Sequence, residues 1–213
     1  VIARAAEIAA ALRQFDLAHD LAELWLQVEP DSQRARQAVA SSLVLLNRVE
    51  ELAPQLATIL EQDQANLGAN LLRLNHMFAR QTDKGAVQRL VNRLAQPYVG
   101  IAEAHFAMAT AAANAGDHPR ALAEIARALD LRPDWEMAAL LRAQLEARLS
   151  AIDAIADLTA FVGRNAEAKD ARLTLARLLL SEKRYGEARP HFDRLLPEFP
   201  DRPEVVYPAA MLA

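Results

Sequence analysis

The chain has 213 residues and is 53% hydrophobic but only 5% aromatic, so its apolar content is mostly Ala, Leu, Val and Ile. Strong helix formers dominate and only 6 glycines occur, which indicates an all-α protein and argues against a disordered chain. The net charge of −4, without a basic face, argues against binding to nucleic acid. The absence of cysteine excludes disulfides and thiolate metal sites.

The sequence leaves the cellular compartment open. No apolar run approaches the roughly 20 residues that a membrane-spanning helix needs. A chain without cysteine fits the cytoplasm and the bacterial periplasm equally. Val1 and the final segment EVVYPAAMLA both fall within helical patterns, and no start methionine or signal peptide precedes them. We therefore expect the chain to be a fragment of a longer protein.

A repeated helix pair organises the chain from its first residues onward. In three stretches an alanine precedes a proline by 12 residues: Ala18 and Pro30, Ala121 and Pro133, and Ala188 and Pro200. Leu52, Ala86 and Ala154 continue this series at intervals of 33 or 34 residues. Six units follow in phase, at residues 1–32, 33–66, 67–101, 102–135, 136–168 and 169–202, with a partial seventh over 203–213. Repetition at this period predicts a single solenoid of stacked helix pairs.

The fourth unit, 102–135, shows the local chemistry most completely. Helices of about 12 to 14 residues are marginal alone in water and need a packing partner. We expect Ala109 to face Ala121 and Ala128, because small residues let two helix axes approach closely. We expect Gly116 to end the first helix and Asp117 to cap the second.

These features resemble the tetratricopeptide repeat (TPR), whose pattern has small residues in both helices, an aromatic residue near the turn and a closing proline. The matching residues are Ala109, Ala121, Ala128 and Pro133 in the fourth unit, Ala176, Tyr185, Ala188, Phe192 and Pro200 in the sixth, and Ala6, Phe15, Ala18 and Pro30 in the first. The resemblance covers essentially the whole chain. It implies an α-α superhelix whose first helices line a concave face that binds protein or peptide partners, without a cofactor.

Several units depart from the TPR pattern. Trp25 and Leu195 stand where the second helix usually has alanine, and the second, third and fifth units lack the closing proline. The third unit ends in the loop AQPYVG. We therefore expect a break in regularity at residues 96–101, and a hinge there if the two halves of the chain move.

The resemblance places the inner face at the second, fifth, ninth and twelfth residues of each unit, which share one side of a helix. In the second unit this stripe includes Gln37, Ser41 and Val44. The protein-binding groove that it predicts consists of Leu71, Asn75, Phe78, Phe106, Thr110, Met137, Leu140, Gln144, Leu173 and Arg177. Large apolar side chains exposed there would indicate a helical or extended partner segment. The alternative is a register shifted by one residue, which would make them ordinary core residues.

One family site is expected to be absent. TPR domains that bind the C-terminal carboxylate of chaperones carry a Lys–Asn–Lys–Arg clamp on successive first helices. Asn75 fits the asparagine, but Leu71 stands where the lysine should be. Glu103 and Phe106 occupy the next positions in place of basic residues.

No catalytic or metal-binding motif stands out in the sequence. His19 and Glu23 lie one helical turn apart, which is more typical of a solvated pair than of metal ligands. Trp25 and Trp135 are more typical of packing between repeats than of a ligand platform. We expect a non-catalytic scaffold or adaptor with no cofactor and no metal.

Three further interpretations stay open. The repeats could form the substrate-recognition arm of a larger enzyme. They could also self-assemble into a homo-oligomer through Tyr207 and Met211. The alanine-, leucine- and arginine-rich style of the repeats resembles bacterial envelope TPR lipoproteins that recruit proteases or help assemble envelope machinery, although a cytoplasmic bacterial protein fits nearly as well.

Overall fold

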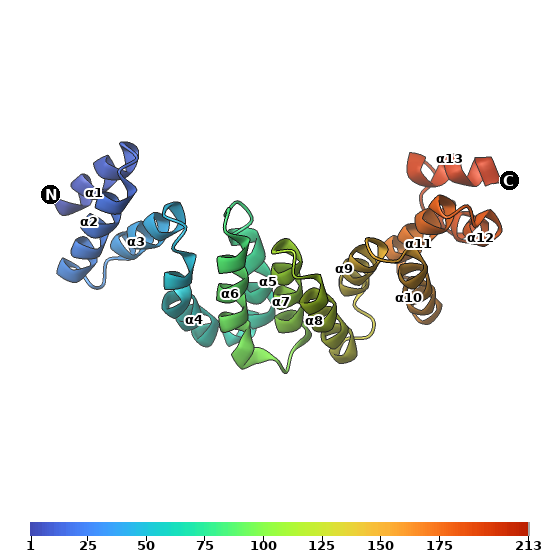
Figure 1. Ribbon diagram of the computed structural model, residues 1–213, viewed down its shortest axis with the longest axis horizontal. Coiled ribbons are helices and arrows are strands. Elements are labelled where there is room, and N and C mark those ends of the chain that lie inside the picture. Colours follow the sequence, from blue (N-terminus) through green and yellow to red (C-terminus); the bar gives the residue numbers. More distant parts are fainter. Residues whose placement is uncertain (213) are drawn as a thin grey trace. The chain divides into compact units, whose positions relative to one another are not determined.

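The computed structural model describes residues 1–212, and within this range it contains helices and loops but no strand. Six helix pairs follow one another and a single helix ends the described chain (Figure 1). The predicted all-α fold of six helix-turn-helix repeats with a partial seventh is therefore confirmed. No helix among these residues is long and apolar enough to cross a bilayer.

The chain divides into two compact units, residues 1–99 (unit 1) and residues 100–213 (unit 2). The boundary falls within the loop at 96–101, where the sequence pattern breaks. Each unit has its own helix pairs. A single solenoid over the whole chain, and a hinge in this loop, stay predictions.

Unit 1 contains three helix pairs. Its helices are α1 (Ile2–Ala11), α2 (Phe15–Val28), α3 (Gln33–Leu45), α4 (Ala53–Gln62), α5 (Leu67–Met77) and α6 (Lys84–Ala95). Short 3₁₀ helices lie at η1 (Val49–Leu52), η2 (Gln64–Asn66) and η3 (Gln96–Tyr98). Small residues such as Ala18 and Ala22 are buried in the first pair, whereas larger ones such as Leu71 and Leu90 are buried in the third. The pairs of this unit therefore differ in how closely their helices can pack.

Unit 2 contains three further pairs and a final helix. Its helices are α7 (Ala102–Asn114), α8 (His118–Leu131), α9 (Glu136–Ala147), α10 (Ala151–Arg164), α11 (Lys169–Ser181), α12 (Tyr185–Leu195) and α13 (Pro203–Leu212). Ala109, Ala121 and Ala128 have no exposed surface, as the sequence predicts for a close contact between α7 and α8. The core of the following pairs is larger and includes Leu175 and Phe192.

A residue in the left-handed conformation ends the first helix in four of the pairs within residues 1–212. These residues are Arg13 (φ 58°), Asn47 (φ 57°), Gly116 (φ 82°) and Lys183 (φ 60°). The expected roles of Gly116 and Asp117 are confirmed, because Asp117 accepts a hydrogen bond from the backbone amide of Arg120 at 3.3 Å. The left-handed residue reverses the chain and lets the second helix fold back on the first.

Candidate functional site

The structure places the ten residues of the predicted groove in both units. Leu71 and Asn75 lie on α5 of unit 1, and Phe78 follows directly after that helix. The other seven lie on α7, α9 and α11 of unit 2, which are the first helices of its three pairs.

In unit 1 the three predicted groove residues are buried. Leu71 and Phe78 have exposed fractions of 0% and 2%, and Asn75 is also buried. The helix α5 contacts both α4 and α6, and Leu74 between Leu71 and Phe78 is buried as well. Leu71 and Phe78 are therefore core residues of unit 1. This agrees with the alternative register, in which these side chains belong to the core and not to the groove. Leu173 of unit 2 is buried in the same way.

The remaining six residues are accessible and lie on successive first helices of unit 2. Phe106, Thr110 and Leu140 are half-buried, whereas Met137, Gln144 and Arg177 are exposed. We refer to these six as the unit 2 face. The hydroxyl of Thr110 donates to the backbone oxygen of Phe106 at 2.9 Å, and Arg177 lies 3.7 Å from the carboxylate of Glu204 on α13. The unit 2 face thus combines apolar side chains with few charges.

Phe106 is held in place by a stack of side chains. Its ring lies 4.8 Å from the ring of Trp135, centroid to centroid, with a tilt of 36°. The guanidinium of Arg132 lies over the ring of Trp135, 4.6 Å from its centroid. Arg132 also forms an ion pair with Glu103. The packing role expected for Trp135 is confirmed, since this residue packs against the core between α7, α8 and α9. An aromatic ring fixed in this way loses little conformational entropy when it binds a partner.

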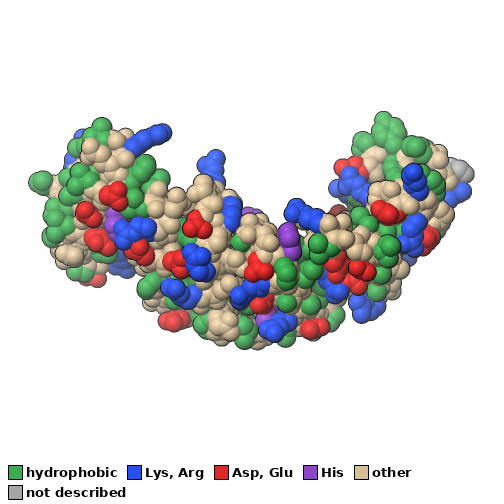
Figure 2. Space-filling model, viewed as in Figure 1, with side chains coloured by type: hydrophobic (Ala, Val, Ile, Leu, Met, Phe, Trp, Pro, Cys, Tyr) green, Lys and Arg blue, Asp and Glu red, His purple; other side chains and the backbone are tan. Residues whose placement is uncertain are grey.

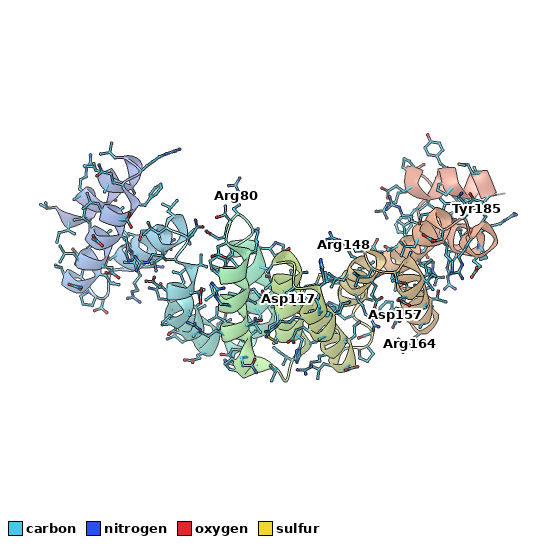
Figure 3. The ribbon with its side chains drawn as sticks, in the orientation of Figure 1. Arg80, Asp117, Arg148, Asp157, Arg164 and Tyr185 are labelled. Carbon is cyan, nitrogen blue, oxygen red and sulfur yellow. The ribbon has the colours of Figure 1, made fainter. Side chains whose placement is uncertain are left out.

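An ion-pair network connects α9 and α10 of unit 2. Arg142 donates to Glu146 at 2.7 Å and also forms an ion pair with Asp157. Desolvation by burial raises the pKa of Glu146, and the neighbouring carboxylate of Asp157 raises it further against the opposing effect of Arg142. Figure 3 shows that Asp157 projects from α10, on the same helix as Arg164. Cavities of about 360 Å³ and about 350 Å³ border this network.

Two buried histidines connect neighbouring helices. His105 on α7 contacts Glu124 on α8, with 2.7 Å between Nδ1 and the carboxylate oxygen. His19 on α2 contacts the hydroxyl of Ser42 on α3 at 2.9 Å. The sequence predicts a solvated pair of His19 and Glu23. The two side chains do lie 3.4 Å apart, and Glu23 is exposed, but His19 is buried, so the prediction that it is solvated is wrong. No group of three His, Cys, Asp or Glu side chains among residues 1–212 could hold a metal ion.

Unit 1 contains a groove that the sequence pattern did not fully predict. It has a volume of about 760 Å³ and lies between α3 and α4, with the end of α5 beside it. We call it the α3/α4 groove; its lining includes Gln37, Val44 and Leu45 of α3, Leu56 and Ile59 of α4, and Phe78. The predicted inner stripe contains Gln37 and Val44, but it omits α4, because the repeat pattern places second helices away from the binding face.

Charged side chains of both signs alternate on the visible surface of each unit (Figure 2). The lining of the α3/α4 groove differs from this surface, because Arg36 is the only charged residue in it among residues 1–212. The two candidate surfaces, the unit 2 face and the α3/α4 groove, are thus both weakly charged and partly apolar.

Comparison with known proteins identifies the fold. Residues 151–211 match the family model of the tetratricopeptide repeat. No curated protein matches the chain by sequence. The C-terminal part of a TPR repeat-containing protein from Cytophaga hutchinsonii is similar in structure, with a TM-score of 0.56 and 13% identity over 97% of this chain and 86% of that chain.

Two further structures show the same likeness. PilF of Pseudomonas aeruginosa has a TM-score of 0.50 and 15% identity, over 99% of this chain and 96% of that chain. A chain of the APC/C hetero-tetramer Cut9–Hcn1 has a TM-score of 0.54 and 14% identity, over 99% of this chain and 42% of that chain. At these identities the comparison establishes the TPR solenoid fold and leaves the partner to the chemistry of the surface.

Proposed function

We propose that this TPR chain is a non-catalytic scaffold that binds a segment of a partner protein on the unit 2 face. One observation supports this function above others: Phe106 is accessible yet fixed by Trp135 and Arg132, and Met137 and Leu140 add apolar surface on the next first helix. Fixed aromatic residues in an apolar patch are typical of the side chains that contribute most to protein binding.

The chemistry of the unit 2 face favours binding over catalysis. Thr110 supplies its only hydroxyl, and that hydroxyl donates to a backbone oxygen of its own helix. A nucleophile would instead need a base within hydrogen-bond distance. The apolar side chains therefore have a clearer use as contacts for a partner.

The test compares proteins that co-purify from the host lysate with the wild-type chain and with the variant Phe106→Asp/Leu140→Asp. We expect the double variant to lose specific partners while its helical circular dichroism signal remains, because both side chains are only half-buried. Leu131→Asp is the control for an added negative charge on this unit, since Leu131 is an exposed apolar residue on α8 outside the unit 2 face. Retention of every partner by the double variant would exclude this face, and loss of helicity would show that the two residues belong to the core.

The setting proposed for this scaffold is a protein assembly or proteolysis machinery of the bacterial envelope. Its support is the resemblance of the repeats to envelope TPR lipoproteins. Mass spectrometry of the partners captured by the wild-type chain and lost in the double variant distinguishes the settings. Envelope proteins among them would support this proposal, and exclusively cytoplasmic ones would contradict it.

A further inference from the structure

The α3/α4 groove lies at the one helix pair that departs from the repeat pattern at a buried position near the start of its second helix. Near the start of the second helix the other five pairs have a buried alanine: Ala18, Ala86, Ala121, Ala154 and Ala188. Leu52 takes this position in the second pair and is also buried. The helices α3 and α4 meet mainly through η1, whereas α7 and α8 pack against each other directly. Leu52 is larger than the alanine of the other pairs, and in this pair α3 and α4 leave an open groove between them.

The separation leaves several apolar side chains of α3 and α4 partly exposed. Leu52, Leu56 and Ile59 line the groove at intervals of four and three residues, which places them on one stripe of the α4 segment. Leu45 and Ile59 are about half exposed, and so is Met77 beside them. Large apolar residues that cluster in one cavity, unlike single ones on a surface, indicate a binding site.

The lining combines apolar and polar side chains. Where α3 ends and α4 begins it includes the apolar Val44, Leu45 and Leu52, with Gln55 beside them. At the start of α3 it includes Gln33 and Arg36, and at the end of α4 it includes Gln62. Among residues 1–212, Arg36 forms no ion pair. Arg36 also lies in the first turns of α3, where the helix dipole adds to its positive potential.

We propose that the α3/α4 groove binds an amphipathic helix of a partner protein that carries an acidic side chain next to its apolar stripe. The apolar stripe would replace the missing contact between α3 and α4, and the acidic side chain would pair with Arg36. This site lies in unit 1 and does not depend on the unit 2 face, so either one can fail without the other.

A helix fits the groove better than an extended segment. The walls are two helices whose backbone groups are already bonded within the helices, so an extended peptide would find few backbone partners. A helix satisfies its own backbone hydrogen bonds and presents apolar side chains at intervals of three and four residues. The ligand is therefore defined by three properties: helical conformation, one apolar stripe and one carboxylate.

The test uses three fluorescein-labelled synthetic peptides of about 16 residues, long enough for partial helicity alone. They are alanine-based, carry leucine at positions i, i+3, i+4 and i+7, and differ only in one residue a turn before the stripe, which is Glu, Gln or Lys. Fluorescence anisotropy with the full chain should show that the Glu peptide binds most tightly and the Lys peptide most weakly. The wild-type chain should bind the Glu peptide with roughly two- to fivefold higher affinity than the Gln peptide, as expected for an exposed ion pair. In Arg36→Gln this difference in affinity should disappear.

Two variants separate the groove from the rest of the surface. Ile59→Asp should weaken all three peptides by about tenfold or more, because it places a charge in the apolar contact. Leu24→Asp is the matched control, since Leu24 is an apolar residue of similar exposure on α2 outside the groove, and it should change nothing. If circular dichroism shows that Ile59→Asp is unfolded, Met77→Gln at the exposed edge takes its place.

Four outcomes would overturn the proposal. The first is the absence of binding of the Glu peptide to the wild-type chain up to roughly 1 mM. The second is equal affinity for the Glu and Gln peptides, which would remove the role of Arg36. The third is equal binding of a proline-containing peptide of the same composition, which would show that no helix is needed. The fourth is a homodimer, measured by sedimentation, that Ile59→Asp dissociates, because the occupant would then be a second copy of this chain.

Discussion

The ion-pair network of Arg142, Glu146 and Asp157 makes a prediction about pH. Because the pKa of Glu146 is raised above its ordinary value of 4.5, the folded state binds a proton at this site more tightly than the unfolded state does. Glu146 therefore makes its full contribution to the free energy of unfolding when the pH is below the ordinary pKa. This contribution is lost as the pH rises through the raised pKa of the folded state.

Glu146→Gln should remove this pH-dependent loss of stability. Glutamine keeps an oxygen that can accept a hydrogen bond from Arg142, but it cannot ionise. The stability of the variant relative to the wild type should therefore increase as the pH rises from the ordinary to the raised pKa of Glu146. Urea unfolding at a series of pH values measures the difference. Glu61→Gln, at an exposed position of α4, is the control for the substitution itself. A difference between Glu146→Gln and wild type that does not change with pH would contradict the prediction.

Residues with one structural role are the easiest to assign from the sequence. Gly116 and Asp117 could be assigned because a left-handed turn and a helix cap each require a particular kind of residue. The burial of Leu71 and Phe78 could not be settled, because periodicity gives the stripe of a helix and not the neighbour that covers it. Asp157 was visible only as an acidic residue, since its partner Arg142 is on another helix.

At the scale of elements, the contact between α7 and α8 depends on Ala121. This residue has no exposed surface and packs in a cluster with Ala112 and Leu145. Ala121→Leu should therefore lower the free energy of unfolding by about 1–3 kcal/mol, because extra atoms in a close contact force the helices apart. Thermal unfolding followed by circular dichroism tests this expectation. Ala123→Leu adds the same atoms at an exposed position of α8 and should have little effect, whereas an unchanged midpoint in Ala121→Leu would contradict the predicted contact.

The sequence predicts the helix pairs well, but it does not predict how closely each pair packs. Six pairs could be phased because alanine, aromatic and proline positions recur together. The separation of α3 and α4 could not be derived, although Leu52 in a series of alanines is visible in the sequence. A larger residue can be accommodated by a new side-chain arrangement or by a shift of the helix, and only the packing around it decides which occurs.

At the scale of the whole molecule, the core of unit 2 suggests that this unit can fold alone. Among the described residues, core clusters of this unit consist of residues from α7 to α13. Repeat proteins gain stability from contacts within each repeat and between neighbouring repeats, so a run of three complete pairs has most of the contacts it needs. Sequence repetition alone predicts one continuous solenoid and gives no position at which it divides, apart from the irregular loop at 96–101.

A fragment of residues 100–213 should therefore be helical and unfold cooperatively. Ala121→Leu should lower its thermal midpoint, because the packing of Ala121 involves residues of unit 2. In the full chain the same substitution should move the transition of unit 2, whereas Leu90→Ala, which leaves a cavity in the core of unit 1, should move the other transition. A fragment without a cooperative transition, or a full chain in which either substitution moves a single transition, would show that the two units fold as one.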